Sequence, residues 1–234
     1  MIEGVLANYE IVGNGKKNML ILHGWKRQIG DWMEVARQLG DRYKVYLLDL
    51  PGFGGSAKPN TDWGIYEYFE FTKSFLQELN IKKWTVLGHS FGGRIGILLA
   101  ARTNLVERLV LVDAAGMEIK SVLSRLIRLI GPTLHWLPQS IKNKFGSRDY
   151  REAGQMRKIF VRIVNQPLRD ELAKITAPAL VLWGEKDKIL NSQEAKILHQ
   201  SIKNSVLRIV WGADHWPHLS KMKEFMGVLE EEGL

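Results

Sequence analysis

Short apolar runs alternate along the chain with longer stretches in which apolar residues recur every three or four positions. The runs are rich in Val, Ile and Leu, and they predict strands at 19–22, 45–48, 85–87, 109–112, 180–183 and 207–210. The longer stretches predict helices at 32–39, 65–79, 91–102, 193–201 and 221–230. Strands that alternate with helices are typical of a parallel sheet covered by helices, and residues 2–12 predict one or two antiparallel strands at the edge of this sheet.

The alternation stops between Ala115 and Thr176. This stretch contains an amphipathic helical pattern, three turn-forming residues and a second helical pattern. They are, in order, Val122, Leu123, Leu126, Ile127 and Ile130, then Gly131, Pro132 and Pro138, then residues 155–164. We therefore predict an α/β core formed by residues 1–116 and 176–234, with a helical lid inserted at 117–175.

The composition fits one domain with a large core. The 234 residues are 45% hydrophobic, and cysteine is absent. The absence of cysteine excludes disulfides, thiolate zinc sites and a cysteine nucleophile, and it fits a reducing compartment. Residues 1–10 lack the basic start and apolar run of a signal peptide, and no apolar stretch reaches the roughly 20 residues that span a bilayer. We expect a cytoplasmic protein without stable membrane insertion, and the sequence does not indicate its oligomeric state.

The net charge of +8 is concentrated in the predicted lid. Residues 117–175 hold twelve Lys and Arg against five Asp and Glu, a net charge of +7. This local excess does not indicate a nucleic-acid partner. A solvated helical face explains it, because Arg125, Arg128, Arg157 and Arg162 alternate with apolar residues at helical spacing. Attraction of an anionic substrate and loose docking on an acidic membrane surface are the alternatives.

A serine between glycines marks the most informative position in the chain. Gly88-His89-Ser90-Phe91-Gly92 follows the predicted strand at 85–87 and opens the predicted helix at 91–102. Glycines on both sides allow a sharp turn, in which Ser90 adopts a strained backbone and its hydroxyl stands clear of the sheet edge. This arrangement is typical of a nucleophile.

Three further polar loops each follow a predicted strand. They are His23-Gly24-Trp25, Gly184-Glu185-Lys186-Asp187 and Gly212-Ala213-Asp214-His215. In a parallel sheet the carboxyl ends of the strands share one edge, so a hydroxyl, a carboxylate and an imidazole can meet there. Serine needs a base that takes its proton and returns it to the leaving group, and His215 suits this role. A carboxylate must in turn orient the imidazole, and we assign this role to Asp187.

Together these motifs resemble the α/β-hydrolase superfamily, in particular its lid-bearing serine hydrolases. The resemblance rests on the turn at Gly88–Gly92, here called the elbow, on the three loops above and on Asp49-Leu50-Pro51-Gly52-Phe53-Gly54-Gly55-Ser56. It implies a mostly parallel central sheet flanked by helices and an oxyanion hole formed by the backbone N–H groups of Trp25 and Phe91. It also implies that a small or medium ester is cleaved through an acyl-enzyme, without cofactor or metal.

Other residues compete for the acid and base roles. Asp113 also ends a predicted strand, at a position where some members of the superfamily carry the acid. Asp214 adjoins His215, but loop aspartates usually bond local backbone. His218 could rival His215 as the base, although a helix-cap or pocket-lining role is the simpler interpretation. A metal site formed by Asp214, His215 and His218 is not expected, because Pro217 disrupts the helix that would align the ligands. The sequence from Gly52 to Ala57 fits a dinucleotide fingerprint, but no helix begins there to hold a pyrophosphate.

The sequence does not identify the substrate. We expect His23 to shape the oxyanion loop, and we expect His23, Phe53, Trp136, Tyr150, Met156 and Phe160 to lie near the substrate. Arg94 could meet a substrate carboxylate, although a structural role on its helix is the simpler interpretation. Several related activities use the same triad of serine, histidine and aspartate, here Ser90, His215 and Asp187. They are thioesterase, lactonase, carbon-carbon bond hydrolase and cofactor-free perhydrolase activities. A non-catalytic receptor that binds a small ligand in the same pocket is the alternative of another class.

Overall fold

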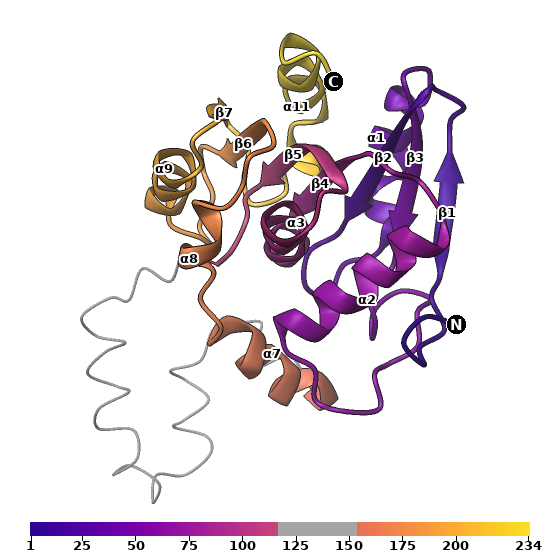
Figure 1. Ribbon diagram of the computed structural model, residues 1–234. Coiled ribbons are helices and arrows are strands. Elements are labelled where there is room, and N and C mark those ends of the chain that lie inside the picture. Colours follow the sequence, from indigo (N-terminus) through magenta and orange to yellow (C-terminus); the bar gives the residue numbers. More distant parts are fainter. Residues whose placement is uncertain (117–153) are drawn as a thin grey trace, which may run out of the picture.

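The computed structural model describes residues 1–116 and 154–234, and its centre is a seven-stranded sheet with the order β1-β3-β2-β4-β5-β6-β7 (Figure 1). The strands are β1 (Tyr9–Val12), β2 (Lys17–Leu22), β3 (Tyr43–Leu48), β4 (Trp84–His89), β5 (Val106–Val112), β6 (Ala179–Gly184) and β7 (Ser205–Val210). All neighbouring pairs are parallel except β1 and β3. The predicted parallel sheet with an antiparallel edge strand is therefore confirmed.

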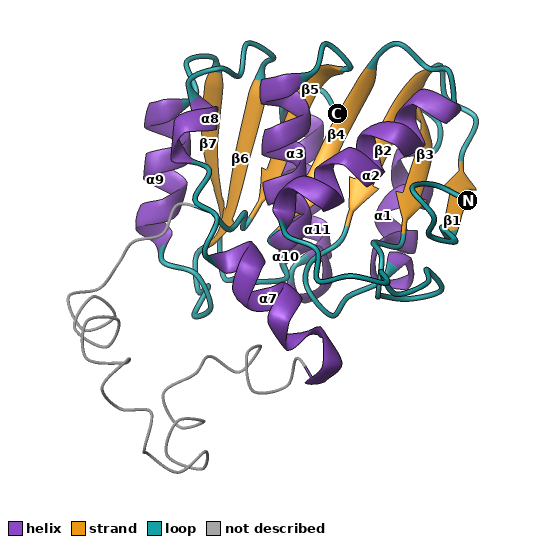
Figure 2. Cartoon of the chain, turned by 60° about the horizontal axis from the view of Figure 1, so that its bottom comes forward, coloured by secondary structure: helices purple, strands orange, loops and turns teal. Residues whose placement is uncertain are grey.

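Helices cover both faces of the sheet (Figure 2). One face carries α2 (Ile65–Glu78), α3 (Phe91–Arg102) and α9 (Ser192–Ser201), and the other carries α1 (Met33–Leu39) and α11 (Met222–Glu231). The shorter elements are η1 (Ile29–Trp32), η4 (Gly154–Met156), α7 (Arg157–Val164), α8 (Arg169–Leu172) and α10 (Pro217–Ser220). The mostly parallel α/β-hydrolase fold predicted from the sequence is thus the observed fold.

Two apolar cores lie on opposite sides of the sheet because successive strand residues point to opposite faces. In β2, Leu20 and Leu22 pack in the core beneath α2 and α3, whereas Met19 and Ile21 pack in the core beneath α1 and α11. All four side chains are buried. The strands are therefore held from both sides, and their carboxyl ends form a fixed edge for the loops that follow.

The described end of the predicted lid packs closely on the core. Ile159 and Ile163 of α7 belong to the same apolar core as α2 and α3. The guanidinium of Arg94 in α3 donates to the backbone carbonyl of Ile163 at 2.7 Å, and the amide oxygen of Gln166 accepts from the N–H of Ile65. Arg94 therefore has the structural role that its place on the buried helix suggested. Residues 117–153 lie outside the described residues, so the domain division at 117–175 stays a prediction.

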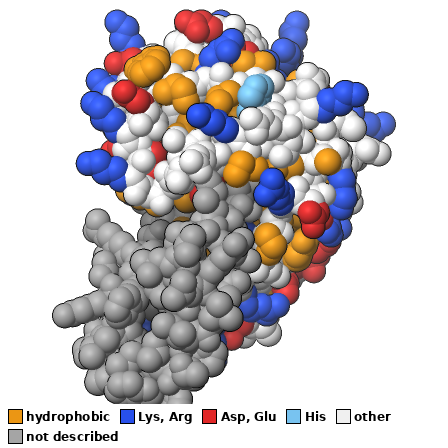
Figure 3. Space-filling model, turned by 90° about the vertical axis from the view of Figure 1, so that its left-hand side faces the viewer, with side chains coloured by type: hydrophobic (Ala, Val, Ile, Leu, Met, Phe, Trp, Pro, Cys, Tyr) orange, Lys and Arg blue, Asp and Glu red, His pale blue; other side chains and the backbone are white. Residues whose placement is uncertain are grey.

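The surface at the α9 end of the sheet carries scattered charges. Lys and Arg side chains are spread over this face among apolar and acidic ones (Figure 3). Among the helices of residues 1–116 and 154–234, none is long and apolar enough to cross a membrane.

Candidate active site

The carboxyl ends of three strands bring Ser90, His215 and Asp187 together. The Nε2 atom of His215 lies 3.1 Å from Ser90 Oγ, and its Nδ1 atom lies 2.8 Å from Asp187 Oδ2. The side chains of His215 and Asp187 are 5% and 1% exposed. Three groups that are far apart in the sequence thus form one continuous hydrogen-bonded chain at the sheet edge.

The turn at Ser90 has the strained geometry that its glycines predict. Ser90 has a φ of 50° and a ψ of −107°, a conformation that L residues rarely adopt. A Cβ on Gly88 would lie 2.5 Å from the carbonyl oxygen of Gly92, and a Cβ on Gly92 would lie 2.2 Å from that of Leu22. The elbow therefore fits against β2 only where side chains are absent.

The His23-Gly24-Trp25 loop lies beside the elbow. Gly92 donates its backbone N–H to the carbonyl of His23 at 3.1 Å, and a Cβ on Gly24 would lie 3.4 Å from Ser90 Cβ. Neither the N–H of Trp25 nor that of Phe91 has an acceptor among the described residues. Two backbone donors next to the elbow in the fold are thus without acceptors in the described part of the chain, and the oxyanion hole at Trp25 and Phe91 stays a prediction.

His23 holds this loop in place through both of its ring nitrogens. Nδ1 lies 2.8 Å from the carbonyl of Gly24, and Nε2 accepts the N–H of Leu50 at 2.9 Å. Burial lowers the pKa of His23, so the ring is neutral. This geometry fits the predicted role in shaping the oxyanion loop. His23 does not line either of the two cavities near Ser90, where it was expected to meet the substrate.

Asp187 is oriented by its own loop. Its Oδ1 accepts the N–H groups of Ile189 and Leu190 at 2.7 and 3.0 Å, while Oδ2 faces His215. Burial by itself would raise the pKa of Asp187. The hydrogen bond and charge of His215 and the two N–H donors outweigh it, so the pKa lies below its ordinary value. Asp187 is therefore held as an anion whose Oδ2 faces the Nδ1 atom of His215.

The rival carboxylates have other partners. Asp113 is fully buried with a φ of 42°, and its Oδ1 accepts the N–H of Gly184 at 2.9 Å. Burial above all raises the pKa of Asp113 well above the ordinary value, and the neighbouring Asp187 carboxylate adds to this rise. Asp214 Oδ1 accepts from the N–H of Trp216 and the hydroxyl of Ser220, which is the local role expected of it.

Asp113, Asp187 and His215 each offer one potential ligand atom within 4.8 Å of the others. A metal there would have to break the 2.8 Å bond between Asp187 and His215, and burial disfavours the charged form of Asp113 that a metal would need. These residues therefore fit a hydrogen-bonded triad better than a metal site.

The other histidines of the site pack beneath it. His89 Nε2 lies 2.8 Å from the carbonyl oxygen of His215. The ring of His218 stacks on Trp32, with centroids 3.7 Å apart and planes 13° apart. Burial is the main cause that lowers the pKa of His218, to about 3. Within the described residues, His215 is the only histidine whose ring bonds to Ser90.

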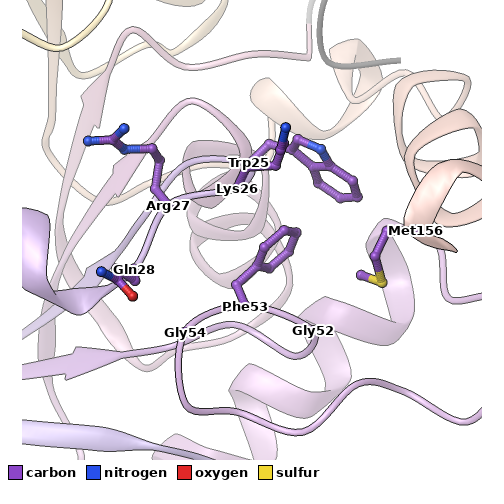
Figure 4. A pocket seen from close by; sticks show the side chains of 8 residues that line it. All are labelled: Trp25, Lys26, Arg27, Gln28, Gly52, Phe53, Gly54 and Met156. Carbon is purple, nitrogen blue, oxygen red and sulfur yellow. The ribbon is translucent and has the colours of Figure 1, made fainter. Parts of the chain in front are cut away.

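Two adjacent cavities lie at the site. The smaller, of about 30 Å³, is lined by Gly24, Trp25, Arg27, His89, Ser90, Ile189, His215 and Trp216. The larger, of about 340 Å³, is lined by Trp25, Lys26, Arg27, Gln28, Gly52, Phe53, Gly54 and Met156 (Figure 4). Trp25 and Arg27 line both, so the two cavities adjoin.

The larger cavity contains two of the residues expected near the substrate, Phe53 and Met156. A third, Phe160, packs on Trp25 with ring centroids 5.1 Å apart. Trp136 and Tyr150 lie outside the described residues. Arg27 lines both cavities but was not among the predicted site residues; its place two residues after Trp25 of the predicted oxyanion loop was the one sequence signal for it.

A mostly parallel sheet of this order, with a serine elbow at its carboxyl edge, is typical of the α/β-hydrolase class. The sequence model of the alpha/beta hydrolase fold matches residues 17–151, more than half of the chain, and the protein belongs to this family.

Its relatives include known and uncharacterized hydrolases. The chain is 29% identical to the uncharacterized hydrolase YugF of Bacillus subtilis, over 88% of this chain and 86% of YugF. It is 26% identical to the pimeloyl-acyl-carrier-protein methyl ester esterase of Nitrosomonas europaea, over 94% of this chain and 97% of that esterase. The solved structure of a bacterial membrane phospholipase A matches with a TM-score of 0.81 and 28% identity, over 98% of this chain and 83% of that one.

Proposed function

We propose that this protein is a serine hydrolase that cleaves a carboxylic ester through an acyl-enzyme. One observation carries the proposal: a single imidazole, that of His215, bonds Ser90 Oγ on one side and the Asp187 carboxylate on the other. A receptor has no need for a base that is aimed at a strained serine. The relationship to an esterase and to a phospholipase supports the same chemistry.

The reaction begins at Ser90. Its Oγ attacks the ester carbonyl carbon while His215 Nε2 takes the hydroxyl proton, and Asp187 stabilises the imidazolium. The carbonyl oxygen becomes an oxyanion, which accepts hydrogen bonds from the N–H groups of Trp25 and Phe91. Collapse of this intermediate breaks the bond to the alkoxy oxygen, and His215 returns the proton to the departing alcohol.

Water completes the cycle. His215 takes a proton from a water molecule, whose oxygen attacks the acyl carbon of the Ser90 ester. The second oxyanion is held by the same two N–H groups. Its collapse releases the carboxylic acid, and His215 returns the proton to Ser90 Oγ. The enzyme thereby regains its starting state.

A fluorophosphonate probe and a chromogenic ester test the proposal. We expect both labelling and turnover in the native protein and neither in Ser90→Ala. Ser74→Ala is the matched control, because Ser74 is a partly exposed serine on α2 that bonds Glu3. Turnover that survives Ser90→Ala would refute the mechanism. Absence of labelling in folded native protein would favour a non-catalytic receptor.

A substrate panel separates the related activities. Oxygen esters, thioesters, lactones and carbon-carbon substrates of matched acyl groups are compared by kcat/KM. We expect oxygen esters to be preferred. A higher kcat/KM for one of the other classes would reassign the reaction while keeping the triad.

A further inference from the structure

One residue, Arg27, lines both cavities of the site. Arg27 lines the small cavity with Ser90 and His215. It also lines the larger cavity of about 340 Å³, which is called the groove from here on. The positive charge of Arg27 also lowers the pKa of the buried His218, although burial is the larger cause. Arg27 therefore places a positive charge close to the proposed reaction centre.

The side chain of Arg27 is held in position. Its Nε atom forms an ion pair with Asp31 Oδ2 at 2.7 Å, one helical turn along the chain. The guanidinium carbon lies 5.7 Å from the ring centroid of Trp216, which is a cation-π distance. The side chain is about one-third exposed. Asp31 is the only acidic side chain in the described residues that pairs with Arg27.

The two terminal nitrogens of Arg27 have no acceptor in the part of the chain that the structure describes. A guanidinium that is anchored through Nε still offers a planar pair of donors at its other end. This geometry matches the two oxygens of a carboxylate or a phosphate. Anchoring also lowers the entropy that is lost on binding.

The groove beside Arg27 has an apolar side. The rings of Trp25 and Phe53 meet edge to face, with centroids 4.9 Å apart. Figure 4 shows Met156 across from these rings, while Arg27 and Gln28 extend on the other side. Met156 also packs on the backbone of Gly52, because a Cβ on Gly52 would lie 2.5 Å from Met156 Cε. The groove thus combines an apolar wall with a cationic side, and its volume suits a small ligand.

We propose that Arg27 binds an anionic oxyacid group, a carboxylate or a phosphate, on an ester whose apolar chain lies in the groove of Trp25, Phe53 and Met156. This inference rests on the proposed serine hydrolase function, and it narrows the substrate to esters that carry a negative charge. Arg27 is then a specificity residue, which holds the charged end while Ser90 attacks the ester carbonyl.

Matched ester pairs test this substrate class. The methyl monoester of a dicarboxylic acid is compared with the methyl ester of the monocarboxylic acid of equal length, and a second pair carries a terminal phosphate in place of the carboxylate. We expect native protein to favour the anionic member of at least one pair, and the two pairs tell carboxylate from phosphate. Arg27→Met should lower the anionic-to-neutral ratio of kcat/KM by about 10- to 100-fold, as expected for one charge-assisted contact. Arg27→Lys should restore part of it.

Arg37→Met is the matched control. Arg37 also pairs with an acid one turn away on its helix, Glu34, but it lines neither cavity. The substitution changes the net charge by the same amount, and the selectivity ratio should stay that of native protein. A native preference for the neutral esters, or an anionic preference that survives Arg27→Met, would overturn the inference.

A binding experiment keeps the two proposals distinguishable. Calorimetry with the dicarboxylic monoester or its phosphate analogue is carried out on Ser90→Ala, with and without Arg27→Met. The second substitution should raise Kd by about 10- to 100-fold. If Ser90 takes no probe while this Arg27-dependent binding persists, the hydrolase function fails and the anion site stands. If neither analogue binds in an Arg27-dependent way, the anion site fails whatever the outcome at Ser90.

Discussion

The ring of His89 supports the backbone of His215: its Nε2 atom lies 2.8 Å from the carbonyl oxygen of that residue. Burial above all lowers the pKa of His89 well below 6.5, so the ring is neutral and Nε2 carries the donated proton. The residue directly before the proposed nucleophile therefore positions the residue that is proposed to act as its base. This bond joins the end of β4 to the loop after β7.

Removing this bond should slow the chemical step. We expect His89→Ala to lower kcat by about tenfold, the size of one net hydrogen bond, because His215 loses a constraint on its position. KM should change less. His89→Gln keeps an N–H donor and should recover part of kcat. Steady-state kinetics measure both effects, with thermal melting to verify folding. A folded His89→Ala protein with native kcat would contradict this positioning role.

The two buried carboxylates should respond very differently to amidation. Asp187→Asn removes the anion that holds the Nδ1 proton of His215, so we expect kcat to fall by about 10³- to 10⁴-fold. Asp113→Asn should cost less than about tenfold, because burial already favours the uncharged form of Asp113 and an amide oxygen can still accept the N–H of Gly184. Single-turnover ester cleavage gives both values. A larger loss in Asp113→Asn would transfer the acid role to Asp113.

Buried His218 should make the fold sensitive to acid. In the folded protein the pKa of His218 is about 3, whereas an unfolded histidine binds a proton near pH 6.5. Between these values the unfolded chain holds more protons, so the free energy of unfolding decreases as the pH falls. The slope from this one residue is about 1.4 kcal/mol per pH unit.

His218→Phe should flatten this dependence, because phenylalanine keeps the stack on Trp32 but takes no proton. Urea unfolding between pH 7 and pH 4 measures the slope in both proteins. Burial raises the pKa of Asp113 and gives the opposite slope, but this contribution is common to both proteins and cancels in the comparison. Equal slopes would show that His218 is protonated without cost in the folded state.

One added methyl group should have opposite effects at two helical glycines. In Gly92→Ala the new carbon would lie 2.2 Å from the carbonyl oxygen of Leu22, so the elbow must separate from the oxyanion loop. We expect a loss of about 1–3 kcal/mol in stability and a loss of most ester turnover.

Gly227→Ala is its control. Gly227 lies inside α11 and a Cβ there meets nothing within 4 Å, so the higher helix propensity of alanine should add about 0.5–1 kcal/mol. Calorimetric melting compares the two variants. An elbow that tolerates Gly92→Ala with native turnover would contradict the close fit against β2.

Much of the fold could be predicted because it depends on local pattern. The apolar runs such as 180–183 lie within observed strands, and the helix predicted at 91–102 has those bounds. The order of the strands could not be predicted in this way. β3 lies on one side of β2, next to β1, and β4 lies on the other side of β2. The crossover connections before and after β3 decide this order, and strand sequences of similar composition do not encode it.

The sequence by itself determined the class of the protein and the loops that carry its polar groups, because the glycine elbow and the strand ends are local features. The tertiary structure decided which groups meet. It brought His215 within hydrogen-bond distance of Asp187. It also let Asp113 accept the N–H of Gly184 and stacked His218 on Trp32. It also brought Arg27 to the lining of both cavities. These choices depend on the paths of loops from strands far apart in the chain, where a shift of a few ångströms makes or breaks a hydrogen bond.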